Sequence, residues 1–187
     1  AKGLELRAML AEHEGMVQWF ANYLVVKRVS LEPNFHQIYS EMLDVLSHKV
    51  LAKSILLSTL QNAQTLLSSP KIRSSSSERS LLKNLGSWLG QVTLARNKPI
   101  LMRDLDMKEL ICDAYETGRL IAVVPFVAKV LDACPNSQVF MPPNPWTVSI
   151  LRLLREIYDT PNLRLPLKFE VEMLHKKLGM EVNDESY

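Results

Sequence analysis

The chain contains four histidines and two cysteines, the side chains that most often bind metals or act as nucleophiles. No pair of histidines has the His-Glu-x-x-His or His-x3-His spacing of a metal site. Cys112 and Cys134 stand 22 positions apart and form no Cys-x-x-Cys motif. The spacing therefore predicts no metal site, free buried thiols, and surface or helix-capping roles for the histidines, which are His13, His36, His48 and His175.

Motifs of the common enzyme classes are also missing from the sequence. It has neither a GxxxxGK(S/T) nor a GxGxxG phosphate-binding loop, and no GxSxG turn that would expose a serine nucleophile. Carboxylates that stand two apart, such as Asp104 and Asp106, point to different faces of a helix and do not form an acid–base pair. We therefore expect no catalysis and no cofactor.

Two other features could serve binding. The segment 73–79 contains four consecutive serines and is typical of a flexible linker, with a phosphorylation site as the alternative. Trp19, Trp88 and Trp146 could stack on RNA bases. Each of them falls within an apolar helical stripe, however, so the pattern predicts core packing.

Helices must position all these side chains, because apolar residues recur at i, i+3, i+4 and i+7 along almost the whole chain. No sustained period-two alternation occurs, so no sheet is expected. Ser75, Asp106 and Asn144 are good caps at predicted helix starts, and the GxxxG motif Gly86–Gly90 predicts close packing of two helices. The sequence predicts an all-α fold with about nine helices, over residues 4–13, 16–30, 33–47, 49–68, 78–96, 107–117, 119–134, 145–159 and 167–178.

The helices have a longer period as well. Every second predicted helix starts 45, 41 and 48 residues after the one before, beginning at Pro33. This is the period of stacked helical hairpins of the HEAT or armadillo type. We therefore expect a single HEAT-like scaffold domain over residues 1–187, with a flexible loop near 69–78, and an extended surface that holds partners.

Composition narrows the kinds of partner. The 187 residues are 47% apolar and 22% charged, with a net charge of +2, too small to mark a nucleic-acid-binding domain. Residues 69–108 nevertheless carry a net charge of +5, between a neutral N-terminal part and a C-terminal part of −3. The longest apolar stretch, 120–128, is too short to span a bilayer. We expect no membrane contact and weak or no direct RNA binding.

Four long stretches identify a related family: NYLVVKRVSLEPNFHQIYS (22–40), RSLLKNLGSWLGQVTLARNKPIL (79–101), VVPFVAKVLD (123–132) and MPPNPWTVSILRLLR (141–155). They resemble the central domain of the large Not-type scaffold subunit of the Ccr-Not deadenylase complex, which has the fold of the middle domain of initiation factor 4G. The resemblance implies a cytoplasmic, non-catalytic scaffold, with P-bodies and the nucleus as further locations. Its implied partners are a Caf-type deadenylase, a DEAD-box RNA helicase and other Ccr-Not subunits, in mRNA decay and translational repression.

Polar residues of these stretches are the predicted partner contacts, because the apolar ones are needed by the array. We expect the charges of the connector 96–104 to project from a turn without serving the core. Two alternatives stay open, an initiation-factor-like adaptor for a translational helicase and an RNA-binding helical repeat. The candidate contacts are Lys27, Arg28, Asn34, His36, Arg96, Asn97, Lys98, Arg103 and Asp104.

Overall fold

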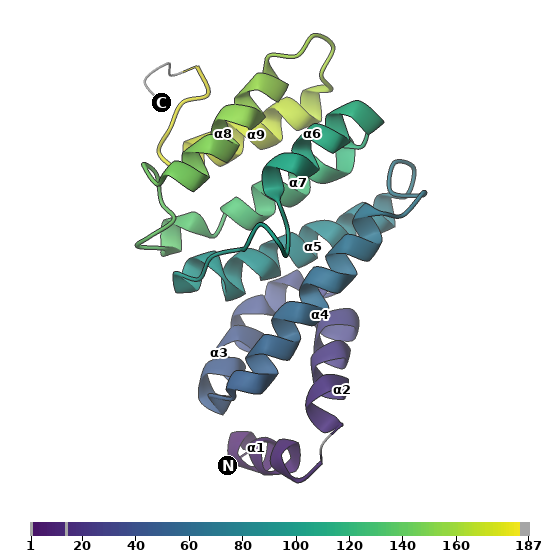
Figure 1. The fold of residues 1–187 in the computed structure, drawn as a ribbon, viewed down its shortest axis with the longest axis vertical. Coiled ribbons are helices and arrows are strands. Elements are labelled where there is room, and N and C mark those ends of the chain that lie inside the picture. Colours follow the sequence, from purple (N-terminus) through teal and green to yellow (C-terminus); the bar gives the residue numbers. More distant parts are fainter. Residues whose placement is uncertain (1, 14, 184–187) are drawn as a thin grey trace.

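The computed structural model describes residues 2–13 and 15–183, and over these ranges the protein is built from helices without a strand (Figure 1). This confirms the predicted all-α class, and each predicted helical range overlaps one α-helix. Short helices extend or connect them: a π-helix at Leu24–Val29 and 3-10 helices at Pro33–Phe35, Leu94–Arg96 and Cys134–Asn136. The α-helices are α1 (Lys2–Glu12), α2 (Met16–Tyr23), α3 (His36–Leu46), α4 (Lys49–Leu67), α5 (Ser76–Val92), α6 (Met107–Thr117), α7 (Leu120–Leu131), α8 (Pro145–Tyr158) and α9 (Leu165–Lys177).

The predicted caps hold the helix starts in place. The Ser75 hydroxyl accepts the amide hydrogen of Glu78, and the Asp106 carboxylate accepts those of residues 108 and 109. The Asn144 side chain does the same for α8. His48 Nδ1 accepts the amide hydrogen of Leu51 at 3.0 Å, so the predicted capping role is correct for this histidine.

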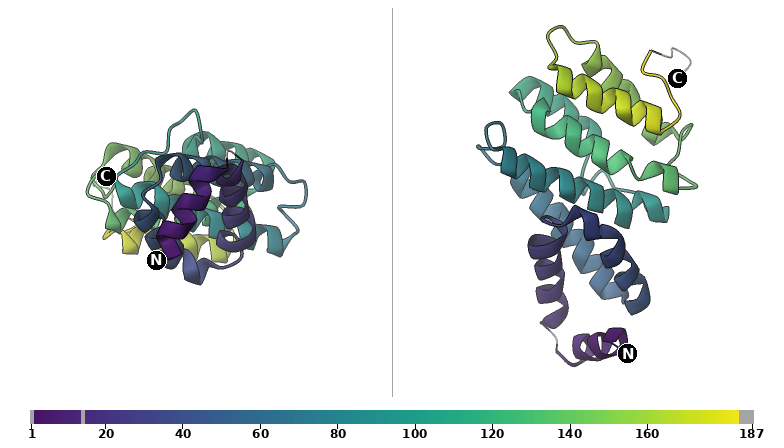
Figure 2. Two further views of the ribbon diagram at one scale, coloured as in Figure 1. Left: turned by 90° about the horizontal axis from the view of Figure 1, so that it is seen from below. Right: turned by 180° about the vertical axis from the view of Figure 1, so that it is seen from behind.

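The helices form two rows. α3, α5, α7 and α9 lie in one row, and α2, α4, α6 and α8 lie in the other, as Figures 1 and 2 show from opposite sides. α1 closes the N-terminal end by packing on α2 and α3. Stacked helical pairs of this kind are the predicted repeat array, whereas the closer likeness to the middle domain of initiation factor 4G stays a prediction. No helix of the described part has the length and apolar character needed to cross a bilayer.

The core is densest where α5 meets α7. Trp88 of α5 and Phe126 of α7 are fully buried. A methyl group added at Gly86 would come within 2.8 Å of the Phe126 carbonyl oxygen, and one at Gly90 within 2.4 Å of the Val130 carbonyl oxygen. The GxxxG motif therefore lets two helix backbones approach closely, as the sequence predicts.

Some burial predictions from the sequence are wrong. Trp19 is 60% exposed, because Ala21 and Leu24 on the opposite side of its helix already face the core. Cys112 is exposed, since α6 buries its other side, while burial raises the pKa of the Cys134 thiol to about 11. Two of the histidines predicted at the surface or at caps, His36 and His175, are buried instead, and each binds a backbone carbonyl at 2.8 Å.

The serine-rich segment is partly helical. α5 starts at Ser76, so the second half of the segment 73–79 forms the first turn of that helix, and only the first half belongs to the turn after α4. The flexibility of the region 69–78 and its phosphorylation stay predictions.

Candidate functional site

A polar groove crosses the row of α3, α5, α7 and α9. Its cavity volume is about 720 Å³, and we call it the central groove. Gln91 of α5 donates a hydrogen bond to Gln37 of α3 at 3.1 Å across it. Farther along, the carboxylate of Asp132, the C-cap of α7, pairs with Lys129 at 3.4 Å and with Lys177 of α9 at 3.2 Å. The groove thus carries the Gln37–Gln91 amides and the Arg96–Asp44 ion pair on its α3 side, and the Asp132 ion-pair cluster on its α9 side.

Three of the predicted contacts meet in this groove, namely Asn34, His36 and Arg96. Asn34 is exposed. His36 is only 4% exposed, its Nε2 donates a hydrogen bond to the Val29 carbonyl oxygen, and its ring meets Trp88 edge-on. Its observed contacts are therefore structural ones.

Arg96 and Asn97 are engaged within the fold, contrary to the expectation that the connector charges project freely. The Arg96 guanidinium donates to Asp44 at 2.6 Å and to the Ser40 hydroxyl at 2.7 Å. The Asn97 side-chain oxygen accepts hydrogen bonds from the Ser137 hydroxyl and the Gln138 amide, both at 2.9 Å. Arg96 thus fixes the start of the connector to α3, and Asn97 fixes it to the segment after α7.

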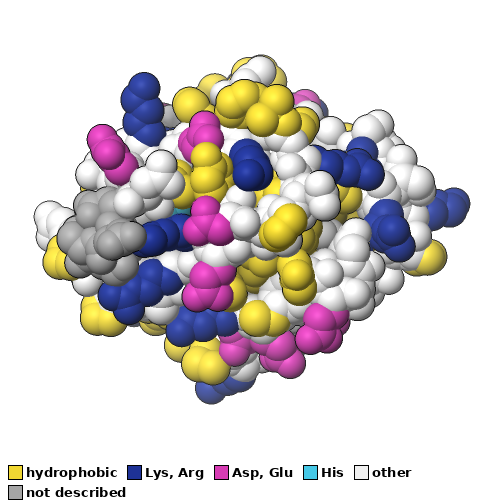
Figure 3. Space-filling view, turned by 90° about the horizontal axis from the view of Figure 1, so that it is seen from above, with side chains coloured by type: hydrophobic (Ala, Val, Ile, Leu, Met, Phe, Trp, Pro, Cys, Tyr) yellow, Lys and Arg dark blue, Asp and Glu magenta, His cyan; other side chains and the backbone are white. Residues whose placement is uncertain are grey.

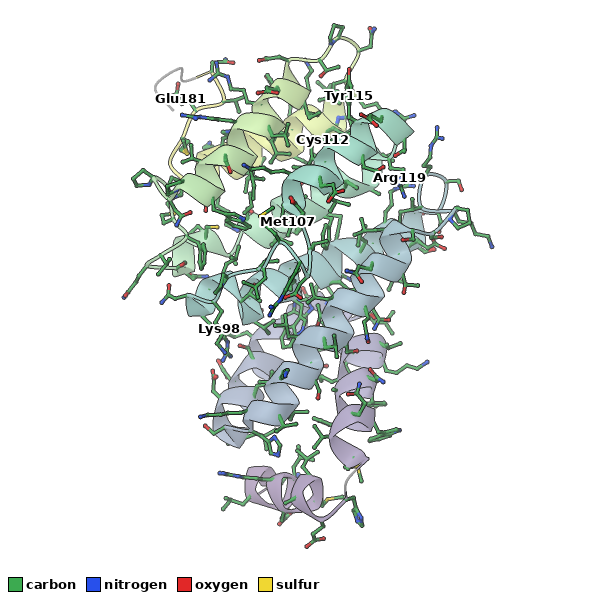
Figure 4. All side chains as sticks on the ribbon, viewed as in Figure 1. Lys98, Met107, Cys112, Tyr115, Arg119 and Glu181 are labelled. Atoms are coloured by element: carbon green, nitrogen blue, oxygen red, sulfur yellow. The ribbon has the colours of Figure 1, made fainter. Side chains whose placement is uncertain are left out.

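The rest of the connector lies elsewhere on the molecule. Lys98 lies outside the central groove and lines a neighbouring cleft of about 480 Å³ between α3 and α4, which Arg96 and Asp44 also border. Figure 4 labels Lys98 far from Arg119. Arg103 and Asp104 lie at a third hollow that α4 and α6 border, and the Arg103 side chain is 80% exposed. The predicted connector contacts therefore do not form a single site.

The π-helix after α2 carries Lys27 and Arg28. Arg28 Nε lies 3.1 Å from Glu32 and donates to the Tyr39 hydroxyl at 3.2 Å, and that hydroxyl in turn donates to Glu32. Burial and the Glu32 carboxylate raise the pKa of Tyr39, so the phenol stays protonated. Arg28 thus links the π-helix to the turn that follows it and to α3, whereas Lys27 is exposed.

An exposed apolar stripe runs along α2 and the π-helix, and the sequence-based contact predictions omitted it. Trp19, Tyr23 and Val26 are 60%, 42% and 40% exposed, and the two aromatic rings stack with centroids 5.5 Å apart. We call these three residues the aromatic stripe. Their i, i+4, i+7 spacing is a second apolar face on one helix, a signal that the sequence does contain.

A comparable apolar face lies at the other end of the array. Leu165, Phe169 and Met173 of α9 are 62%, 53% and 65% exposed. Figure 3 looks onto this end and shows hydrophobic side chains interspersed with charges of both signs. Within the described ranges, no cluster of three or more His, Cys, Asp or Glu residues could hold a metal ion.

Comparison with known proteins decides the family. Residues 1–186 match the family described as the CAF1-binding domain of CCR4-NOT transcription complex subunit 1. The chain belongs to this family. Membership agrees with the resemblance to the Not-type subunit and with the prediction that the chain is not an enzyme.

The chain is also similar to individual proteins of a nematode and of two yeasts. The chain is 43% identical over 185 residues to "CCR4-NOT transcription complex subunit let-711" of Caenorhabditis elegans, covering 96% of the chain and 7% of the relative. It is 42% identical over 166 residues to "General negative regulator of transcription subunit 1" of Schizosaccharomyces pombe, covering 89% of the chain and 8% of the relative. The Saccharomyces cerevisiae protein of the same name is 42% identical over 162 residues, with shares of 87% and 8%. The chain thus spans less than a tenth of these relatives.

Proposed function

We propose that this domain is a non-catalytic docking platform of a CCR4-NOT-type complex and that it binds a Caf-type deadenylase. The family match over residues 1–186 carries the proposal, because the family is described by CAF1 binding. The domain would act in the cytoplasm, in mRNA deadenylation, decay and translational repression. An extended two-row array with exposed faces suits a protein that holds partners.

The aromatic stripe is our candidate surface for the deadenylase. Trp and Tyr are enriched at the centres of protein interfaces, where they supply large apolar area at little cost in side-chain entropy. Trp19 and Tyr23 are pre-stacked, so a partner would meet an ordered surface. α2 belongs to the row opposite the central groove, which leaves that groove open to another partner.

A pair of matched double variants tests this assignment. Trp19→Ala/Tyr23→Ala should weaken binding of a purified Caf-type deadenylase by about tenfold or more, as loss of interface anchors does. Phe169→Ala/Met173→Ala removes two side chains of similar exposure on α9 and should leave the affinity unchanged. Circular dichroism should show the same helix content for both variants. Equal affinities would overturn the placement, and a parent chain that fails to bind would overturn the proposed function.

We further assign the central groove to a DEAD-box helicase. A partner that contacts both mobile lobes of such an enzyme biases it towards its closed state. The groove crosses α3, α5, α7 and α9, and it offers polar groups at both ends, the Gln37–Gln91 amides with the Arg96–Asp44 pair on the α3 side and the Asp132 cluster on the α9 side. Each end could hold one lobe.

Stimulation of the helicase ATPase distinguishes a contact at the central groove from a contact at the connector. Gln37→Arg/Gln91→Arg places two bulky side chains across the groove and should abolish stimulation of the helicase ATPase. Lys98→Ala/Arg103→Ala changes connector residues outside the groove and should retain it. The reverse result would assign the helicase to the connector.

The two alternative functions are less well supported. Membership in a CCR4-NOT family favours a deadenylation scaffold over an initiation-factor adaptor. An RNA platform built from the three tryptophans is disfavoured, since Trp88 is fully buried. If the chain did bind RNA through its basic segment, the affinity would fall steeply with salt.

A further inference from the structure

Three inter-helix turns meet at one edge of the array, at the right in Figure 1. They connect α4 to α5, α6 to α7 and α8 to α9, and they enclose a cleft of about 550 Å³ that we call the edge cleft. Much of its lining is apolar and comes from all three turns. The apolar lining residues are Pro70, Leu120, Ile121, Leu163 and Leu167.

Each of the three turns also carries an arginine, and the three arginines differ in their contacts. Arg119 is engaged within the fold, where it pairs with Asp113 and donates to the Leu67 carbonyl oxygen at 2.8 Å. Arg73 and Arg164 line the cleft, are exposed, and have no ion-pair partner among the residues that the structure describes. No described residue that lines the cleft is acidic.

The helix starts add to this positive edge. Arg119 and Arg164 occupy the N-cap positions of α7 and α9, and neither helix has a side-chain cap. A cation at a helix N-terminus is unfavourable, because the helix dipole already places partial positive charge there. Such a departure from local preference is typical of a binding site. Asp113 already offsets the charge of Arg119, and an anionic ligand would offset that of Arg164.

We propose that the edge cleft binds a short acidic peptide segment of a partner, anchored by one large apolar side chain. The guanidinium groups of Arg73 and Arg164 suit carboxylates, which Arg binds through two parallel hydrogen bonds. The aliphatic floor suits a Leu, Ile or Phe side chain. Nucleic acid fits this site less well, because the described lining offers no aromatic ring on which a base could stack. The proposal concerns a surface separate from both surfaces assigned above.

Selection from a random peptide library tests the proposal. A phage-displayed library of random linear peptides is selected on the whole chain, and the enriched peptides are synthesised and labelled. We expect Asp or Glu beside an aliphatic or Phe residue in the enriched sequences. In a nitrogen-15 correlation spectrum, these peptides should shift the amide signals of Ser74, Gly118 and Leu163.

Charge-reversal variants locate the binding site. Arg73→Glu/Arg164→Glu should lower the affinity by about tenfold or more, since it replaces two attractive charges with repulsive ones. Lys98→Glu/Arg103→Glu makes the same change in net charge on other surfaces and should change the affinity by less than about twofold. Enriched peptides without acidic residues, equal effects of the two variants, or displacement of the peptide by oligouridylate would each overturn the proposal.

Discussion

His36 shows how the array accommodates a polar side chain in its interior. Its Nε2 donates a hydrogen bond to the Val29 carbonyl oxygen at 2.8 Å, and its ring packs edge-on against Trp88 with centroids 5.4 Å apart. Burial lowers the pKa of the His36 imidazole below its ordinary value of 6.5, and burial does the same to His175. The folded protein therefore keeps both rings neutral at pH values where the unfolded chain already binds protons.

This pKa shift predicts a stability that depends on pH. Because the unfolded chain binds more protons as the pH falls through 6.5, the free energy of unfolding should be largest above that value and should decrease below it. His36→Gln should make the decrease shallower, whereas His13→Gln, at an exposed site, should not. Urea unfolding at about pH 7.5 and pH 5.5 measures the difference. A parent chain that is equally stable at both pH values would contradict the prediction.

Arg96 and Lys98 stand two positions apart and should respond differently to mutation. Arg96 connects the connector to α3 through Asp44 and Ser40, so Arg96→Ala should lower the free energy of unfolding by about 1 kcal/mol. The exposed Lys98 makes no such contact among the described residues, and Lys98→Ala should leave stability unchanged. The urea midpoints of the two variants check this. Equal midpoints would show that the contacts of Arg96 contribute nothing to stability.

At the scale of elements, the contact between α5 and α7 depends on two small residues. Gly90→Ala would place a methyl group 2.4 Å from the Val130 carbonyl oxygen, so the helices would have to move apart. We expect a loss of about 1–3 kcal/mol in the free energy of unfolding, typical of overpacking. Gly15→Ala is the control, since nothing lies within 4 Å of its added methyl group. Thermal unfolding followed by circular dichroism measures both, and a stable Gly90→Ala variant would contradict the close packing.

Helix positions and caps could be predicted from the sequence because their causes are local. Ser75, Asp106 and Asn144 bind amides two or three residues away, and each helix start was found at or near them. The π-helix at Leu24–Val29 could not be predicted, because distant groups hold its end. Asn84 of α5 donates to the Ser30 carbonyl oxygen at 2.7 Å, across 54 positions of sequence.

At the scale of the whole molecule, the central groove could not be predicted from the sequence. Asp132 and Lys177 come together only because α7 packs on α9, and Gln37 meets Gln91 only through the order of the rows. Helical periodicity predicts which face of a helix is buried, but it does not predict which other helix packs against that face. The same limit explains why Arg96 and Arg103, close in sequence, lie at different surfaces.

The most direct test of the docking role is isothermal titration of the purified chain with a purified Caf-type deadenylase, after nuclease treatment of both. We predict a complex with one copy of each protein that forms without RNA. In parallel, the chain alone should leave a poly(A) substrate intact, whereas the complex should shorten it. Failure to form the complex, or shortening of poly(A) by the chain alone, would contradict a non-catalytic docking domain.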